Sequence, residues 1–281
     1  MQVALRDHIV EPSDWPVVMG VLNVTPDSFS DGGRFVGCDD AVNAALGMIA
    51  EGAAIVDVGP ESTRPGSSSV SDDEQISRAI PVIERIRSQD AAITISIDTT
   101  SAKVARAAID AGADMINDTS ALRDDPAMAE VATSSRALLC LMHRRGMPAD
   151  MQRGGGPVYA DVIAEILAFL KERVELAAEA GIARERIVID PGIGFGKRTE
   201  DNLAIMKNIN QFVELGHPVL IGASRKRFIG EVVGADDPCD REAGSLTCAV
   251  LAAQAGAAVV RVHDVRATAE AIHLHKAIVD D

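Results

Sequence analysis

The chain has 281 residues, of which 47% are hydrophobic and only 3% aromatic, so we expect a large core of aliphatic side chains. The formal net charge of −15 argues against broad binding to nucleic acid or to an anionic membrane, because both need a basic field. The four cysteines show no CxxC spacing, and no N-terminal run is apolar enough for a signal peptide or a membrane span. We therefore expect free thiols and a cytoplasmic protein.

Short apolar runs alternate with helical patterns after a polar lead-in at residues 1–16. The runs that predict strands are 17–23, 53–59, 92–99, 113–120, 137–143, 186–197, 217–226 and 257–265. The helical patterns are 40–51, 72–86, 102–111, 126–133, 158–180, 200–215, 241–255 and 266–279. Three polar residues are expected to cap helices, namely Asp39, Ser101 and Thr199.

The strands are near-continuous apolar runs, which is typical of parallel strands covered on both faces. Eight strand–helix repeats in this length predict an α/β fold, a closed (β/α)8 TIM barrel, with an open doubly wound sheet as the alternative. We see no domain boundary, so residues 1–281 are expected to form a single domain. Three long polar or glycine-rich loops interrupt the pattern, at 24–35, 60–70 and 144–157.

Every predicted strand ends in or near a side chain that can hydrogen-bond or carry charge. In a (β/α)8 barrel these ends meet at one mouth, where the chemistry of such folds occurs. In chain order they are Asn23, Asp57 with Thr63 and Arg64, Asp98, Asn117, Met142 with His143, Asp190, Ser224 with Arg225 and Lys226, and Arg261 with His263. One such residue has an ordinary structural explanation, whereas all eight ends together indicate a ligand site.

These side chains suit a heterocycle joined to a diphosphate. Asp98, Asn117 and Asp190 can hydrogen-bond the edge of an NH-rich ring, and Lys226 can donate to a ring carbonyl or nitrogen. The groups suited to phosphate oxygens are Asn23, Arg64, Arg261 and His263. A diphosphate is usually accompanied by Mg²⁺, for which Asn23 offers one oxygen ligand.

The stretch 219–230 predicts a strand that delivers a hydroxyl and three cations to its end, where a helix begins. The hydroxyl is Ser224 and the cations are Arg225, Lys226 and Arg227. A strand end, a helix N-terminus and a basic cluster together predict an anion site. A solvated basic loop is the alternative.

Other kinds of site find little support in the sequence. There is no GxSxG elbow, no recognisable Cys/His pair and no His/Cys cluster with zinc spacing. The glycine-rich run 192–196 does not match the full dinucleotide-binding fingerprint, so we assign it to loop geometry.

The motifs resemble those of the dihydropteroate synthase family, folate-pathway enzymes that sulfonamides target. The segments that carry the resemblance span almost the whole chain in family order. They are 19–33, 61–66, 96–99, 116–118, 141–143, 190–197, 222–230 and 260–265.

The resemblance implies a (β/α)8 homodimer that joins 6-hydroxymethyl-7,8-dihydropterin diphosphate to p-aminobenzoate. Matching positions imply a pterin held by Asp98, Asn117, Asp190 and Lys226 and lined by Met142, Phe195 and Gly222. They imply a diphosphate bound by Asn23, Arg261 and His263, with Mg²⁺ bridging to Asn23. They also imply that p-aminobenzoate lies near Thr63 and Ser224, under Phe29 and Pro65 from two mobile loops.

The resemblance also implies a dissociative displacement through a carbocation-like pterin, without an enzyme nucleophile. The residues expected to act in it are Asp98 and Asp31, which favour the positive charge, Lys226, and Arg261 and His263, which stabilise the leaving diphosphate. Two departures from the family stand beside this site. Residues 119–122 replace a turn that commonly contains glycine, and Pro60 stands where glycine is often found.

Two other functions are compatible with such a pocket. A methyltransferase-type domain that passes a methyl group from a folate to a corrinoid shares the Asp/Asn pterin pocket. It does not need the Arg261 and His263 pair or the loop at 24–35. A non-catalytic pterin-binding paralogue is the second alternative.

Overall fold

The structure is a computed structural model that describes residues 3–6, 9–10, 16–25, 33–61, 70–146 and 157–279. Eight strands in this part of the chain form one parallel sheet. They are β3 (Val17–Asn23), β4 (Ile55–Gly59), β5 (Thr94–Asp98), β6 (Met115–Asp118), β7 (Leu138–Met142), β8 (Ile187–Asp190), β9 (Leu220–Ile221) and β10 (Val259–Val262).

The sheet closes on itself as a barrel. From β3 to β8 each strand pairs with the next, and β10 pairs with both β9 and β3. Between β8 and β9, Ile189 lies opposite Val219, and the Ile189 amide donates to the Pro218 carbonyl at 2.9 Å. The predicted (β/α)8 barrel is confirmed, and the open doubly wound sheet is excluded.

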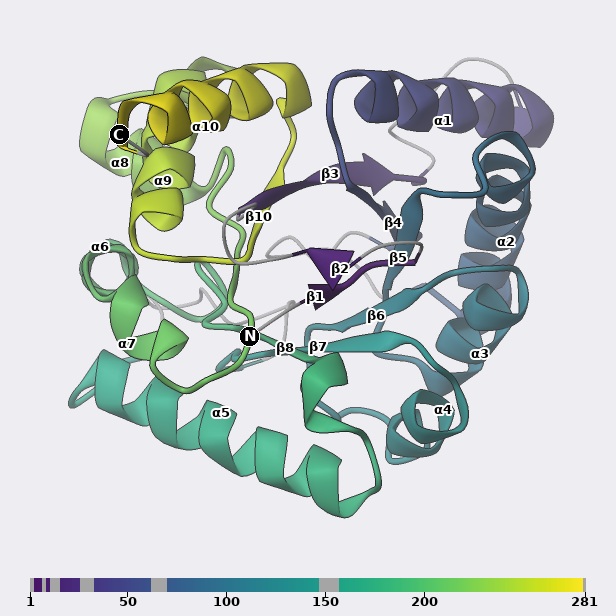
Figure 1. Cartoon of the computed structure of the whole chain (residues 1–281), viewed down its shortest axis with the longest axis horizontal. Coiled ribbons are helices and arrows are strands. Elements are labelled where there is room, and N and C mark those ends of the chain that lie inside the picture. The colour runs from purple at the N-terminus through teal and green to yellow at the C-terminus, as the bar shows by residue number, and fades with distance from the viewer. Residues whose placement is uncertain are drawn as a thin grey trace.

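Helices surround the ring of strands in chain order (Figure 1). They are α1 (Gly33–Ala50), α2 (Asp72–Gln89), α3 (Ala102–Asp110), α4 (Met128–Ser134), α5 (Val162–Glu179), α6 (Thr199–Lys207), α7 (Ile209–Val213), α8 (Arg227–Val233), α9 (Glu242–Gln254) and α10 (Val265–Val279), with short 3-10 turns η4 (Arg184–Arg186) and η5 (Pro238–Arg241). No helix in the described ranges is long and apolar enough to cross a membrane. The four cysteines are free, as predicted.

The predicted helix starts are correct in one case and wrong in two. Ser101 caps α3, because its hydroxyl accepts the Val104 amide hydrogen bond at 3.3 Å. Asp39 does not cap α1, which begins at Gly33 inside the expected loop. The Asp39 carboxylate lies within the helix and pairs instead with Arg85 of α2. Thr199 is the first residue of α6 rather than its cap.

The predicted helix 200–215 is divided into α6 and α7 at Asn208. The side-chain amide of Asn208 donates to the Ala204 carbonyl at 2.8 Å, and its backbone leaves the helical region, with φ −120° and ψ 26°. Asparagine favours such breaks because its side chain competes for backbone hydrogen bonds.

The N-terminal segment forms an antiparallel hairpin of β1 (Val3–Ala4) and β2 (Ile9–Val10), which lies over the middle of the ring in Figure 1. Val3, Leu5 and Val10 are buried against side chains of the barrel strands. The Arg6 amide also donates to Thr94 Oγ1 at 3.1 Å. The expectation of a simple polar lead-in is therefore wrong, since this segment covers one end of the barrel.

Side chains inside the barrel form an apolar tier under the hairpin and a polar tier at the mouth. The apolar tier includes Met19, Ile55, Met115, Cys140, Val188, Leu220 and Val259. The polar tier includes Asp57, Ser96, Asp98, Asn117 and Asp190, all buried. Because side chains alternate between the two faces of a strand, Asp57 shares the inner face of β4 with Ile55.

The turn after β6 has left-handed backbone angles without glycine. Ala121 has a φ of 54° and Leu122 a φ of 63°, which costs roughly 1–2 kcal/mol per residue. The buried Asp118 carboxylate holds this turn. It accepts hydrogen bonds from the Ser120 amide at 2.8 Å, the Ser120 hydroxyl at 2.7 Å and the Leu122 amide at 2.6 Å. Asp118 thus stabilises the turn in which residues 119–122 lack the family's usual glycine.

An Asp118→Ala variant is therefore expected to unfold more easily, with a free energy of unfolding lower by about 2–4 kcal/mol. Urea denaturation measures this change. The matched control is Asp73→Ala, since Asp73 is an exposed partner of Lys103 and its removal should leave the urea midpoint nearly unchanged. Equal effects in the two variants would contradict the role of Asp118.

Candidate active site

An ionic network from four strands lies at the mouth of the barrel. Arg261 of β10 donates from Nε to Asp57 Oδ2 of β4 at 2.6 Å, and from Nη2 to Asp98 Oδ2 of β5 at 3.0 Å. Asn117 of β6 donates from Nδ2 to the same Asp57 oxygen at 3.2 Å. One guanidinium therefore joins two buried carboxylates, and an amide from a neighbouring strand completes the cluster.

Each carboxylate in this network keeps a second oxygen without a partner among the described residues. Asp57 Oδ1 and Asp98 Oδ1 are buried and accept no hydrogen bond there, and neither does the Ser96 hydroxyl oxygen. Leaving a buried polar atom unsatisfied costs about 1–3 kcal/mol. These acceptors suit a ligand that brings several N–H donors into the mouth.

Asp190 and Met142 lie at the paired ends of β8 and β7. Asp190 is 6% exposed, and its Oδ1 accepts the Gly192 amide hydrogen bond at 2.6 Å. Met142 is also buried, and a Cβ added to Gly192 would lie 3.2 Å from its Cγ. Burial raises the pKa of Asp190. The end of β8 therefore carries a buried carboxylate into the polar tier, as the sequence predicts.

Lys226 extends over the loop that follows β8. Its Nζ donates to the Ile193 carbonyl at 2.6 Å and lies 4.1 Å from the centre of the Phe195 ring. A Cβ on Gly194 would come within 2.8 Å of Lys226 Cδ, so this glycine leaves room for the lysine stem. Lys226 and Phe195, which the sequence places in one site, are in direct contact.

The neighbouring cations do not join Lys226 in one cluster. Arg225 has a left-handed backbone, with φ 57°, and donates from Nε to Asp264 at 3.0 Å. Arg227 is exposed and pairs with Glu231 at 2.8 Å. The predicted anion site with three cations is thus corrected, because Arg225 and Arg227 are each paired with a carboxylate.

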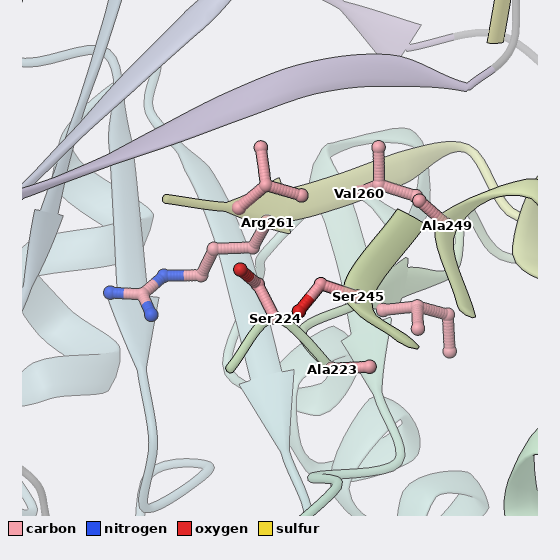
Figure 2. A pocket seen from close by; sticks show the side chains of 8 residues that line it. Ala223, Ser224, Ser245, Ala249, Val260 and Arg261 are labelled. Carbon is pink, nitrogen blue, oxygen red and sulfur yellow. The ribbon is translucent and has the colours of Figure 1, made fainter. Parts of the chain in front are cut away.

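Ser224 and His263 form a pair beside the network. The Ser224 hydroxyl accepts the His263 backbone amide hydrogen bond at 3.2 Å and lies 3.0 Å from His263 Nδ1. Figure 2 shows the small pocket behind Ser224, with the Arg261 side chain extending away from Ser224 and Ser245. Its cavity volume of about 10 Å³ has room for roughly one water molecule. The mouth residues, not this pocket, therefore form the main candidate site.

Asn23 ends β3 opposite Gly59 of β4. A Cβ on Gly59 would lie 3.3 Å from Asn23 Oδ1, so the glycine leaves space for the carboxamide. A neutral oxygen at a barrel rim suits Mg²⁺ that takes most of its ligands from phosphates and water. No group of three or more His, Cys, Asp or Glu side chains forms a metal site in the described ranges. A single carboxamide oxygen such as that of Asn23 fits an ion whose other ligands come from substrate phosphates and water.

Burial shifts the ionisation of the mouth residues in opposite directions. It raises the pKa of Asp98 to about 7, although the charge of Arg261 lowers it. It lowers the pKa of Lys226 to about 8, and Asp190 offsets this only in part. Burial also disfavours the charge on Arg261, but Asp57 and Asp98 raise its pKa above the ordinary value. Asp98 and Lys226 are therefore both mainly charged only between about pH 7 and pH 8.

The structure brings most of the predicted site residues to one mouth. Five others lie outside the described residues and remain predictions: Phe29, Asp31, Thr63, Arg64 and Pro65. Of the residues seen, Gly222 lies beside Arg261, since a Cβ on it would be 3.7 Å from Arg261 Cβ. His143, which shares a strand end with Met142, instead packs edge-on against Phe169 at 4.9 Å.

Sequence reasoning left two buried residues without a role. Asp57 ends a predicted strand but has no predicted ligand. Its alternation with the outward-facing Val56 and Val58 is a signal for an inward carboxylate. Lys197 is 2% exposed behind the Phe195 loop. No periodic pattern marks it in a glycine-rich segment.

The chain is similar to known proteins over most of its length. A family model described as pterin binding enzyme matches residues 19–263. The dihydropteroate synthase of Mycobacterium leprae is 48% identical over 260 residues, which cover 91% of this chain and 90% of that protein. The Xanthomonas albilineans dihydropteroate synthase structure with 4-aminobenzoic acid has a TM-score of 0.90 at 45% identity, covering 99% and 97% of the two chains. A Yersinia pestis dihydropteroate synthase structure with a sulfonamide drug complex has a TM-score of 0.92 at 38% identity and covers both chains fully, at 100% each.

Proposed function

The chain belongs to the family of pterin-binding enzymes, as a dihydropteroate synthase, and we propose that its barrel mouth joins 6-hydroxymethyl-7,8-dihydropterin diphosphate to p-aminobenzoate. The products are 7,8-dihydropteroate and diphosphate, so the protein is a transferase of folate biosynthesis. The unsatisfied oxygens of Asp57 and Asp98 beside Arg261 carry the proposal. A pterin ring offers the N–H donors that such oxygens lack. A folate-to-corrinoid methyltransferase is not favoured, because the relatives reported above are dihydropteroate synthases.

The polar tier would recognise the pterin by its edge. Asp98 and Asp190 accept from its N–H groups, Asn117 reads its amide edge, and Lys226 donates to its carbonyl or ring nitrogen. The residues expected to line the ring are Met142, Phe195 and Gly222. Because the buried polar groups need partners, a ring without matching donors would bind poorly.

The reaction is a displacement at the pterin methylene carbon. The bond from this carbon to the diphosphate oxygen breaks, and the amine of p-aminobenzoate forms the new C–N bond and loses a proton. Asp98, with Asp31, favours positive charge on the pterin, while Arg261 and His263 stabilise the departing diphosphate. Arg261 has five N–H donors, of which the two carboxylates use one each. The arylamine is neutral near pH 7, so no dedicated general base is required.

Magnesium is the proposed metal, and Asn23 would be its protein ligand. When bound, Mg²⁺ would neutralise charge on the diphosphate. The support is the position of Asn23 at the end of β3, where the absence of a side chain on Gly59 leaves room for its carboxamide. This site is compatible with a single protein ligand, because Mg²⁺ commonly keeps several waters and substrate phosphates.

The second substrate is proposed to lie at the outer part of the mouth. Ser224 and Thr63 would contact p-aminobenzoate, with Phe29 and Pro65 closing over its ring and Arg64 reaching the diphosphate. Sulfonamide inhibitors would take the same position, which agrees with the Yersinia pestis protein and its sulfonamide drug complex. Closure of the two loops would exclude water from the reactive pterin.

The test is release of diphosphate in the presence of Mg²⁺ with each substrate alone and with both together. Release that requires both substrates, with 7,8-dihydropteroate formed in equal amount, is the expected result. Binding of the pterin diphosphate without any release would instead identify a non-catalytic paralogue.

The pKa values of Asp98 and Lys226 predict a narrow pH optimum. The kcat/KM for the pterin diphosphate should fall below about pH 7, where Asp98 gains a proton, and above about pH 8, where Lys226 loses one. Each limb should approach a tenfold change per pH unit, measured from pH 6 to 9.5. The Lys226→Arg variant keeps a permanent positive charge. Its remaining kcat/KM should therefore not fall above pH 8. A flat wild-type profile would contradict both assignments.

A homodimer is proposed on the side of α6, α8, α9 and α10. Large apolar side chains are exposed there, namely Leu203, Val232, Val233, Leu251, Leu274 and Ile278. These helices adjoin one another in Figure 1, so the exposed apolar side chains gather on one side of the molecule, as they do at protein–protein interfaces. Sedimentation of the wild type and of Val232→Asp tests whether this surface forms the homodimer.

The four free cysteines support a reducing, cytoplasmic location.

A further inference from the structure

The loop after β8, residues 191–197, packs its backbone directly against the loop after β7. Gly192 and Gly196 have left-handed φ values of 71° and 63°. A Cβ on Gly192 would lie 1.9 Å from the His143 carbonyl oxygen, and one on Gly196 would lie 1.9 Å from the Arg145 carbonyl oxygen. No side chain fits at that distance. The contact between the two loops therefore brings backbone carbonyl oxygens together inside the protein.

Lys197 places its ammonium group among these oxygens. Its Nζ donates to the carbonyls of Gly192 at 2.7 Å, Phe195 at 3.1 Å and His143 at 3.2 Å. It also lies 3.0 Å from His143 Nδ1. Burial lowers the pKa of His143 to about 2, so its ring is neutral and Nδ1 accepts a hydrogen bond from the lysine.

Carbonyl dipoles make the direct contacts to this lysine, while the charges of Asp190 and Asp201 also favour its ammonium form. Lys197 is 2% exposed. Lysine is almost never fully buried unless it is paired, and burial lowers the pKa of Lys197 to about 7. Burying the Lys197 ammonium lowers the stability of the folded state. This cost indicates that the ammonium has a role in the loop to which it donates.

That loop carries three parts of the pterin site. Asp190, at its start, accepts the Gly192 amide hydrogen bond at 2.6 Å. The Ile193 carbonyl accepts from Lys226 Nζ at 2.6 Å, and the Phe195 ring lies 4.1 Å from that nitrogen. The position of the loop therefore sets the position of the Lys226 ammonium.

We propose that Lys197 is a positioning residue for the pterin site, whose ammonium joins the β7 and β8 loops and so holds the loop that places Lys226. The inference rests on the proposed function. Without the ammonium, the carbonyl oxygens of Gly192, Phe195 and His143 would lose the donor they share, and only the Phe195 amide at 3.1 Å would still donate to Gly192. Repulsion between these oxygens would then open the contact. Asp190 and Phe195 would move with the loop, whereas the residues proposed for p-aminobenzoate belong to other elements.

The test is Lys197→Met, which keeps the stem and removes the ammonium. The KM for the pterin diphosphate should rise by about 5- to 30-fold, whereas kcat and the KM for p-aminobenzoate should change by less than about threefold. Tyr159→Phe is the matched control, because Tyr159 donates to the Gly196 carbonyl of the same loop at 2.8 Å without touching the ammonium. It should leave both KM values unchanged within twofold, by the same reasoning.

Hydrogen exchange of the amides in residues 192–196 gives a readout independent of activity. Exchange should be at least about tenfold faster in Lys197→Met than in wild type. If that variant does not fold, His143→Phe removes one acceptor while keeping a ring against Phe169, and should shift the pterin KM and the exchange in the same direction by less. Unchanged exchange with unchanged pterin KM, or an equal rise in both KM values, would overturn the proposal. If the wild type neither binds the pterin diphosphate nor releases diphosphate, the proposed function is wrong. The difference in hydrogen exchange between wild type and Lys197→Met would still test the contact between the two loops.

Discussion

The Arg261→Ala variant is expected to lose about 100- to 1,000-fold in kcat/KM for the pterin diphosphate. It is also expected to lose about 3–5 kcal/mol in free energy of unfolding. Activity falls because the guanidinium no longer stabilises the departing diphosphate. Stability falls because Asp57, with a fully buried side chain, and Asp98, with a side chain 5% exposed, lose their cation. Steady-state kinetics and urea denaturation measure the two losses separately.

A second substitution separates these two effects. Adding Asp57→Asn to Arg261→Ala removes one of the uncompensated charges, so part of the stability should return while the activity stays low. Arg266→Ala is the control, because the side chain of this arginine is 71% exposed and its Nε lies 3.8 Å from Glu51 Oε1, a long distance for an ion pair. Its removal should change stability by less than about 1 kcal/mol and leave kcat/KM unchanged. If the Arg261→Ala variant has the same kcat/KM as the wild type, Arg261 has no part in the proposed mechanism.

The Lys226→Met variant is expected to bind the pterin diphosphate about 10- to 150-fold more weakly, the value of a hydrogen bond to a charged group. Its temperature of unfolding should nevertheless stay the same or rise. Burial lowers the pKa of Lys226 from 10.5 to about 8, so the folded state holds this charge at a cost that methionine does not carry. Isothermal titration with the pterin diphosphate and a thermal unfolding scan test the two statements together.

The adjacent cation provides the control for this experiment. Arg227 is exposed and paired with Glu231, and Arg227→Ala should change the pterin affinity by less than about twofold. If both variants weaken binding equally, the effect is one of overall charge and not of Lys226 at the Phe195 loop. If Lys226→Met leaves the affinity intact, Lys226 does not contact the pterin.

The barrel and its mouth could be predicted because the apolar runs end abruptly in polar residues. Asp98 and Asp190 stand at the ends of strands with buried aliphatic side chains, where a carboxylate contributes no apolar packing. The strand–helix order then brings such ends together. Asn117 is the residue predicted for the site, but the apolar run alone does not explain why it, and not the adjacent Asp118, faces the mouth. Only the alternation of side chains in the folded sheet places Asn117 beside Asp57 and leaves Asp118 to hold the turn.

Other features depend on contacts that leave no local pattern. Asp57 and its partner Arg261 are 204 positions apart, so neither neighbourhood reveals the pair. Lys197 and Lys226 both follow glycine-containing segments, but one ammonium is enclosed by carbonyls and the other lies over Phe195. The hairpin of β1 and β2 has strands of two residues each, too short for any periodicity to appear.

The bond between Asp57 and Arg261 makes substrate recognition depend on the last strand to be synthesised. A nascent chain emerging from the ribosome can form β4 early, yet its Asp57 lacks a cation until β10 has joined β3. Substrate would therefore bind only to molecules in which the ring of strands is already closed. Fragments that end before residue 259 should gain no stability when substrate is added.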